Sequence, residues 1–97
     1  MSPNKKKKLN NLRKQLDLLD DSFLKLIKKR TNLVTKVLSL KNYKNQIVDR
    51  KRINVILNNI KKKSKKNKID TRITLKVWKS MINAFIQYEF RNFKKKR

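Results

Sequence analysis

The feature that most constrains this chain is an apolar stripe that runs through its first forty residues. Its members recur at steps of three, four or seven residues, which is the spacing of one face of a long α-helix. They are Leu9, Leu12, Leu16, Leu19, Phe23, Leu26, Leu33, Val37 and Leu40. The chain has no glycine and its single proline is Pro3, so nothing interrupts the predicted helix from about Lys8 to Lys41.

A helix of that extent is too long for a globule of this size. Roughly 32 residues make a rod of about 48 Å, whereas a folded chain of 97 residues has an expected radius of gyration of about 12–13 Å. So small a monomer also buries only about 60–65% of the surface of its unfolded chain. We therefore expect the first helix to pack against an antiparallel partner chain.

Two shorter helical patterns follow, separated by polar segments. Residues 42–48 lose the stripe and are predicted to form a connection, and a second helix is predicted from near Asp49. Its apolar face consists of Ile53, Ile56, Leu57 and Ile60. Residues 61–67 are predicted to form a charged loop. A third helix is expected after Ile69 as a hydrophobic staple and Asp70 as N-cap. Its apolar side consists of Ile73, Val77, Trp78, Met81, Ile82, Phe85 and Tyr88.

These patterns predict an all-α fold of three helices, the first long, the second short and the third of medium length. We expect residues 1–8 to be a basic N-terminal tail, residues 9–92 to be one helical domain and residues 93–97 to be a basic C-terminal tail.

The residue types that the chain lacks exclude several kinds of site. Without cysteine there is no disulfide and no thiolate zinc site, and without histidine no Ser-His-Asp triad and no imidazole metal site. Without glycine there is no phosphate-binding loop. We expect neither metal nor cofactor. No apolar run approaches the ~20 residues of a membrane span, and none follows the basic N-terminus as in a signal peptide, so we expect a cytoplasmic protein without a membrane partner.

The large positive charge leaves several interpretations open. Lys and Arg number 30 and Asp and Glu number 6, which gives a formal net charge of +24. Nucleic acid or an anionic membrane surface would suit such a charge. Lysines spread along the whole chain are also expected from a compositional bias that fills solvated positions with lysine. The densest runs lie at the two ends and in the predicted loop, where solvated lysines are usual.

Charged residues interrupt the apolar stripe of the first helix. Arg30 takes an interior position of the stripe, while Arg13 and Lys41 lie at its edges. An arginine in the interior is typical of a structural salt bridge, and a long basic side chain at an edge usually extends to water. Taken singly, none of the three residues requires a ligand.

The other two helices repeat the same feature. Asp49 and Arg52 share the apolar face of the second helix, and Glu89 lies on that of the third. Asp49 is a suitable N-cap or a partner for Arg52, and Glu89 is a suitable partner for a nearby cation. A bundle would bring these faces together with the cations of the first helix. Because buried charges must be compensated, the excess of cations predicts a binding site for an anion.

From Leu9 to Phe90 the sequence resembles the all-α, AroQ-type chorismate mutases. The matching segments are residues 12–20, 26–30, 37–41, 48–52 and 78–89. The order and spacing of Arg13, Asp20, Arg30, Lys41, Asp49 and Arg52 carry the resemblance. It implies an intertwined homodimer in which the long first helices run antiparallel. It also implies the conversion of chorismate, a dianion, to prephenate in phenylalanine and tyrosine biosynthesis, without a cofactor.

The resemblance also implies roles for single residues. Arg30, together with Arg13 from the other subunit, would bind the two substrate carboxylates. Lys41 would donate to the ether oxygen and to a carboxylate. Asp49 and Arg52 would hold the substrate hydroxyl and the network around it.

Three further positions bear on the expected chemistry. Glu89 stands where the family has Gln or Glu facing the ether oxygen. Because negative charge grows on that oxygen, we expect the protonated acid, which donates a hydrogen bond, to be the active form. Phe85 is predicted to line the site, although the family often has a small polar residue there. Ile53 replaces a glutamate that often helps to bind the substrate hydroxyl.

Other functions remain open from the sequence. Isochorismate pyruvate lyases share the fold, the arginines and the lysine, but Asp49 and the spacing around it favour the mutase. A basic helical nucleic-acid-binding protein would explain the charge, but it gives no reason for Arg30 and Glu89 to lie on apolar faces. A non-catalytic helical dimer is a third alternative.

Overall fold

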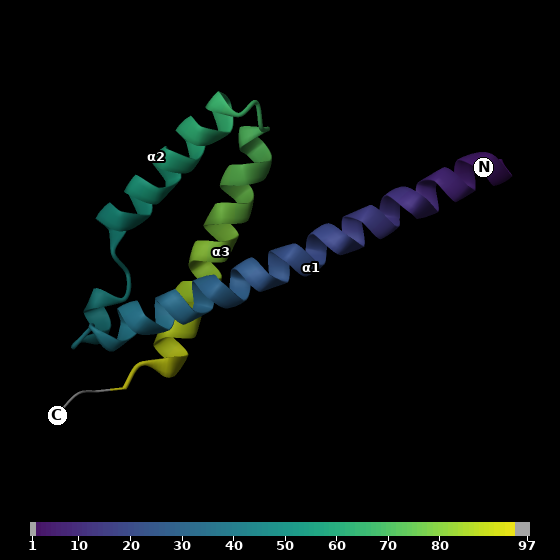
Figure 1. Ribbon diagram of the computed structural model, residues 1–97. Coiled ribbons are helices and arrows are strands. Elements are labelled where there is room, and N and C mark those ends of the chain that lie inside the picture. Colours follow the sequence, from purple (N-terminus) through teal and green to yellow (C-terminus); the bar gives the residue numbers. More distant parts are fainter. Residues whose placement is uncertain (1, 95–97) are drawn as a thin grey trace. The chain divides into compact units, whose positions relative to one another are not determined.

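The computed structural model describes residues 2–94, and in that range it consists of helices without a strand (Figure 1). Helix α1 spans Pro3–Ser39, α2 spans Arg50–Lys66 and α3 spans Thr71–Asn92, with a short 3-10 helix at Lys44–Gln46. The all-α class and the order long, short, medium are thereby confirmed. The structure divides into two units, Met1–Leu33 and Val34–Arg97, and α1 contributes to both.

In the first unit, α1 begins earlier than the sequence indicated. The predicted start near Lys8 is wrong, because the helix already begins at Pro3. The Ser2 hydroxyl accepts a hydrogen bond from the Lys5 amide at 3.3 Å, and the Ser2 carbonyl accepts one from the Lys6 amide at 2.9 Å. Proline is favoured at the first helical position and lysine is a good helix former, so the basic run continues the helix.

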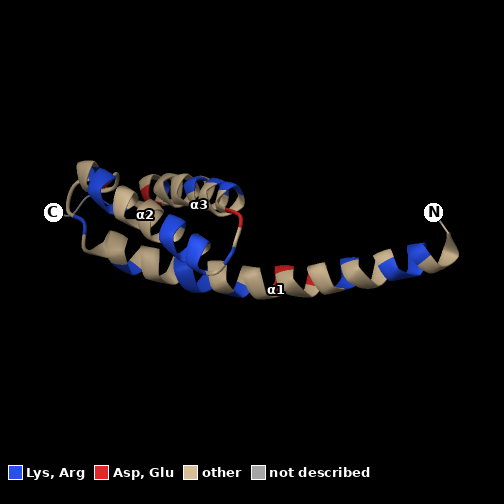
Figure 2. Ribbon diagram, turned by 90° about the horizontal axis from the view of Figure 1, so that it is seen from above, with Lys and Arg blue, Asp and Glu red and all other residues tan. Residues whose placement is uncertain are grey.

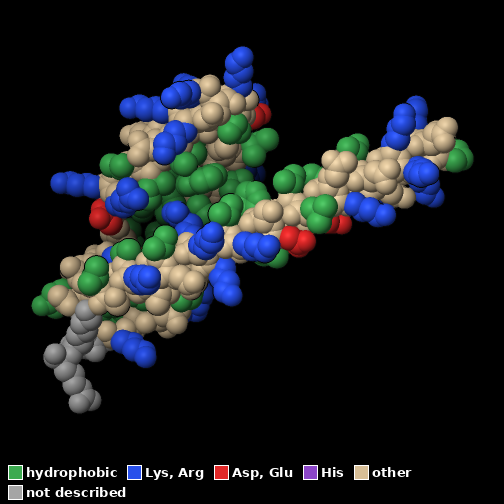
Figure 3. Space-filling view, viewed as in Figure 1, with side chains coloured by type: hydrophobic (Ala, Val, Ile, Leu, Met, Phe, Trp, Pro, Cys, Tyr) green, Lys and Arg blue, Asp and Glu red, His purple; other side chains and the backbone are tan. Residues whose placement is uncertain are grey.

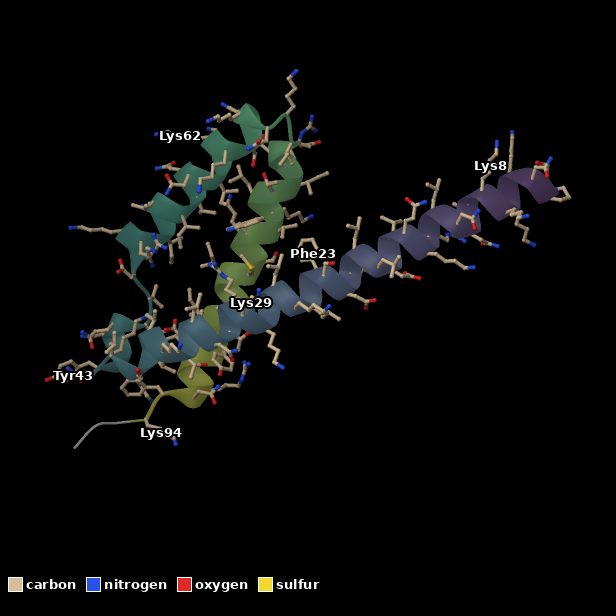
Figure 4. The ribbon with its side chains drawn as sticks, viewed as in Figure 1. Lys8, Phe23, Lys29, Tyr43, Lys62 and Lys94 are labelled. Carbon is tan, nitrogen blue, oxygen red and sulfur yellow. The ribbon has the colours of Figure 1, made fainter. Side chains whose placement is uncertain are left out.

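The apolar stripe of the first unit is exposed in the single chain. Leu9 is half-buried, but the five large side chains that follow it on the stripe are between 56% and 62% exposed, and Phe23 is labelled in Figure 4. They are Leu12, Leu16, Leu19, Phe23 and Leu26. A contiguous apolar face of this kind on one helix is usually covered by another helix.

The second unit contains the end of α1 and an antiparallel pair formed by α2 and α3 (Figure 1). Hydrophobic side chains gather over α2 and α3 in Figure 3. Leu38 in α1 and Ile47 after the 3-10 helix are 7% and 3% exposed. The buried Ser64 hydroxyl of α2 donates to the Ile60 carbonyl at 2.6 Å and lies 2.8 Å from the Thr74 hydroxyl of α3. These hydrogen bonds satisfy a polar group inside the pair of helices.

Helix α2 continues through the lysine-rich segment, so the predicted loop at residues 61–67 is wrong. The helix ends at Lys66, and Lys68 takes a left-handed conformation with φ of 56°. The Lys68 amide donates to the Lys65 carbonyl at 3.2 Å and the Ile69 amide to the Ser64 carbonyl at 2.8 Å, which is the Schellman pattern. Lysines favour the last turn because their charge complements the helix dipole.

Helix α3 begins as predicted. The Asp70 carboxylate accepts a hydrogen bond from the Arg72 amide at 2.8 Å and so caps the helix. Lys and Arg recur along all three helices (Figure 2). None of the described helices is both long and apolar enough to cross a membrane. Residues 95–97, the end of the predicted C-terminal tail, lie outside the described residues.

Candidate active site

The candidate site begins at Lys41, which lies just beyond the end of α1. The Leu40 and Lys41 amides donate to the Val37 and Leu38 carbonyls, each at 3.0 Å, and so complete the end of the helix. The Lys41 side chain is only 18% exposed. The alternative that Lys41 extends into solvent is therefore wrong.

Glu89 in α3 is the partner of Lys41. Its Oε1 accepts a hydrogen bond from Lys41 Nζ at 3.0 Å, and Nζ also lies 3.5 Å from the Ile47 carbonyl oxygen. Glu89 is the only glutamate in the chain, and it is 6% exposed. A buried carboxylate is costly unless a cation compensates it, and Lys41 supplies that charge. Two of the predicted site residues, both shielded from solvent, therefore meet each other.

This arrangement leaves Lys41 able to bind a further anionic group. An ammonium group has three N–H donors, and the hydrogen bonds to Glu89 and Ile47 use two of them. In surroundings of reduced dielectric constant, the remaining donor interacts more strongly with a negative charge than it would in water. Phe85 lies one helical turn before Glu89 and is half-buried.

A second contact joins the same two segments. The Thr35 and Tyr88 hydroxyl oxygens lie 2.8 Å apart, so one donates a hydrogen bond to the other. The sequence placed Tyr88 on the apolar side of its helix but did not predict this partner. The Tyr88 hydroxyl could have indicated such a partner, because a tyrosine at the edge of a core usually forms a hydrogen bond.

Asp49 and Arg52 lie together at the start of α2. Asp49 has an extended backbone, and its Oδ1 accepts a hydrogen bond from the Arg52 amide at 3.0 Å. Asp49 is therefore the N-cap of α2, which is one of the two structural roles expected for it from the sequence. Both residues are exposed, and within residues 2–94 the Arg52 guanidinium forms no hydrogen bond or ion pair. Their roles toward a substrate stay predictions.

Arg13 and Arg30 both lie in the α1 helix of the first unit. Arg13 is exposed and Arg30 is half-buried. Seventeen residues separate them, which corresponds to about 26 Å along the helix axis. Two groups that far apart on one rod do not bind the same small molecule. If both bind one substrate, they come from different copies of the chain.

The chemistry that these side chains offer includes binding and electrostatic stabilisation. The chain has no cysteine or histidine, and no group of three potential metal ligands occurs among the residues that the structure describes. A partly buried lysine and a buried carboxyl group are suited to stabilise charge that develops on a bound anion.

Comparison with known proteins gives the family. No curated protein and no solved structure is significantly similar to the chain. The family description "Chorismate mutase type II" matches residues 12–90, a range that runs through all three helices and includes Lys41 and Glu89. This match covers more than three quarters of the sequence and confirms the resemblance found there. The chain therefore belongs to the chorismate mutase type II family.

Proposed function

We propose that the protein converts chorismate to prephenate. Membership of the chorismate mutase type II family supports this chemistry in general. The observation that carries the specific proposal is the contact between Lys41 and Glu89, in which a shielded ammonium group lies 3.0 Å from a buried carboxyl oxygen. The residues that the family uses at an ether oxygen are a cation and a Gln or Glu, and these two side chains match them.

The reaction is an intramolecular Claisen rearrangement. The ether C–O bond breaks while a new C–C bond forms, in a cyclic movement of three electron pairs. No proton is transferred and no covalent intermediate forms, so the absence of cysteine and histidine is no obstacle. The protein must hold the substrate in its reactive conformer and stabilise the negative charge that grows on the ether oxygen.

Lys41 and Glu89 are proposed to act at the ether oxygen. Lys41 would donate its remaining N–H to the oxygen or to a neighbouring carboxylate. Glu89 would donate a hydrogen bond in its protonated form, because an ionised carboxylate would repel the growing charge.

The arginines are proposed to bind the two carboxylates of the substrate. A guanidinium group forms two parallel hydrogen bonds to a carboxylate, which suits Arg30 and Arg13 to this role. Asp49 and Arg52 are proposed to contact the substrate hydroxyl, with Phe85 lining the site.

A homodimer is part of the proposal. The exposed apolar stripe of the first unit requires a cover, and the helix of a second copy has the same length and the same stripe. The axial separation of about 26 Å between Arg13 and Arg30 supports a site in which Arg13 comes from the second copy. An antiparallel pair of first helices meets both requirements.

The test is loss of chorismate absorbance on addition of purified protein, with isochorismate assayed in parallel. We expect turnover of chorismate, and a fall of at least 100-fold for Arg30→Ala with unchanged helicity by circular dichroism. Arg72→Ala, which removes an exposed arginine of α3, is the matched control and should keep full activity. Pyruvate release from isochorismate without turnover of chorismate would instead identify a lyase.

A further inference from the structure

The hydrogen bond between Thr35 and Tyr88 has no place in the chemistry proposed above. Thr35 lies in the last turns of α1, and Tyr88 precedes Glu89 in α3. Their hydroxyl oxygens are 2.8 Å apart. The same end of α1 and the same turn of α3 are joined by the contact of Lys41 with Glu89 at 3.0 Å. Two contacts of different character therefore hold α3 against the end of α1.

The two contacts differ in stiffness. Lys41 reaches Glu89 through a flexible four-carbon chain, so this ion pair tolerates a small rotation or shift of α3. Threonine is branched at Cβ and has few χ1 rotamers, and tyrosine turns about only two side-chain bonds. The hydrogen bond between Thr35 and Tyr88 therefore fixes α3 more firmly than the ion pair does.

The position of Tyr88 in the helix links it to Glu89. Consecutive residues of an α-helix are about 100° apart around the axis and 1.5 Å apart along it. Fixing the Tyr88 ring thus determines both the direction in which the neighbouring Glu89 side chain leaves α3 and its height along the helix. Glu89 in turn determines where the Lys41 ammonium group lies, because Nζ contacts Oε1.

We propose that Thr35 and Tyr88 are positioning residues for the Lys41 and Glu89 pair, an inference that rests on the proposed mutase function. They touch no substrate in this proposal and act by holding Glu89 in place. Thr35 is exposed and Tyr88 is half-buried, so water can replace the lost hydrogen bond and its removal leaves no isolated polar group in a core. The expected effect is therefore on the geometry of the site rather than on folding.

The kinetic test uses Tyr88→Phe and Thr35→Val, each of which removes one hydroxyl and keeps the shape of the side chain. We expect kcat to fall about 3–10-fold with KM changed less than twofold, because the bound substrate meets a displaced Glu89. The double variant should be no worse than either single variant, since both remove the same hydrogen bond. Thr35→Ser, which keeps the hydroxyl, should retain activity close to that of the unaltered protein.

Tyr43→Phe is the matched control. It makes the same chemical change at the chain's only other tyrosine, which is 68% exposed on the connection after α1 (Figure 4). We expect its kcat and KM to equal those of the unaltered protein. A kcat within twofold of the unaltered value for both Tyr88→Phe and Thr35→Val would overturn the proposal.

A second readout does not depend on turnover. Because Glu89 is the only glutamate, protein made with glutamate labelled at its side-chain carboxyl carbon with ¹³C gives one glutamate carboxyl signal. In Tyr88→Phe and Thr35→Val this signal should move toward that of an exposed glutamate, and in Tyr43→Phe it should not move. An unmoved signal in the first two variants would overturn the positioning role, whatever their activity. If the unaltered protein does not convert chorismate, the proposed function fails, and the carboxyl signal still decides whether Thr35 and Tyr88 position Glu89.

Discussion

The two units of the chain differ in burial: among residues 2–94, every buried side chain lies in the second unit. In the first unit, the stripe residues of α1 from Leu12 to Leu33 are more than half exposed, although Leu9 is half-buried. In the second unit, burial extends to the polar side chains of Ser64 and Glu89, which are 3% and 6% exposed. The second unit thus satisfies its own buried groups, whereas the first presents an apolar face that a single copy leaves exposed. The comparison supports the proposal that a second chain covers the first unit, whereas the second unit is ordered by its own contacts.

The strongest test of this comparison is complementation between two inactive variants. If Arg13 and Arg30 serve one site from different copies, Arg13→Ala and Arg30→Ala should each be nearly inactive. A mixed dimer of the two then has one intact site and one site without either arginine. With random assortment, half of the dimers are mixed, so about a quarter of the normal activity should return after the two proteins are unfolded and refolded together.

In the control for complementation, the protein mixed with Arg13→Ala also lacks Arg13, so neither copy can supply that arginine. Mixing Arg13→Ala with the double variant Arg13→Ala/Arg30→Ala should restore nothing. Native mass spectrometry, with one partner isotope-labelled, measures the mixed dimers independently of activity. Mixed dimers without recovered turnover would contradict the shared site, and a monomeric protein would contradict the homodimer.

The second test concerns the buried carboxyl group of the second unit. If the protonated form of Glu89 donates to the ether oxygen, kcat/KM should fall as pH rises, because an ionised carboxylate has no proton to donate. Glu89→Gln keeps a donor at every pH and should give a flat profile, exceeding the unaltered protein several-fold at the alkaline end. Gln87→Glu, which places a carboxyl group on an exposed position of α3, is the control and should keep the original profile. Identical profiles for Glu89→Gln and the unaltered protein would contradict the proposed hydrogen bond.

Regular local patterns were predictable from the sequence. The α1 stripe, the order of the helices and the Asp70 cap each depend on residues that are near one another in the chain. The sequence also placed Lys41 and Glu89 among the charges on apolar faces. Their direct contact was not predictable, because it joins residues 48 positions apart and depends on how α3 packs against the end of α1.

The errors have a common physical cause. Lysine runs at residues 5–8 and 61–66 were interpreted as solvated tail and loop, although lysine is a good helix former. A residue that is exposed to solvent can still lie in a regular helix. With no glycine in the chain, nothing in the sequence marked the left-handed residue that ends α2, and Lys68 takes that position instead.

The end of α2 therefore provides the test with the smallest expected effect, and that effect is local to one turn of the chain. Lys68 has φ of 56°, where a side chain with Cβ is strained and glycine is not. Lys68→Gly should raise the free energy of unfolding by about 0.5–1 kcal/mol, because relief of strain exceeds the entropy that glycine adds to the unfolded chain. The same exchange at Lys62, which is exposed within α2 (Figure 4), removes the same charge but should lower that free energy by about 1 kcal/mol. Urea denaturation at one fixed protein concentration measures both, since dissociation of a dimer also contributes. If both exchanges lower the free energy of unfolding, Lys68 is unstrained. If Lys68→Gly raises it and Lys62→Gly lowers it, backbone conformation, and not the density of lysine, determines where α2 ends.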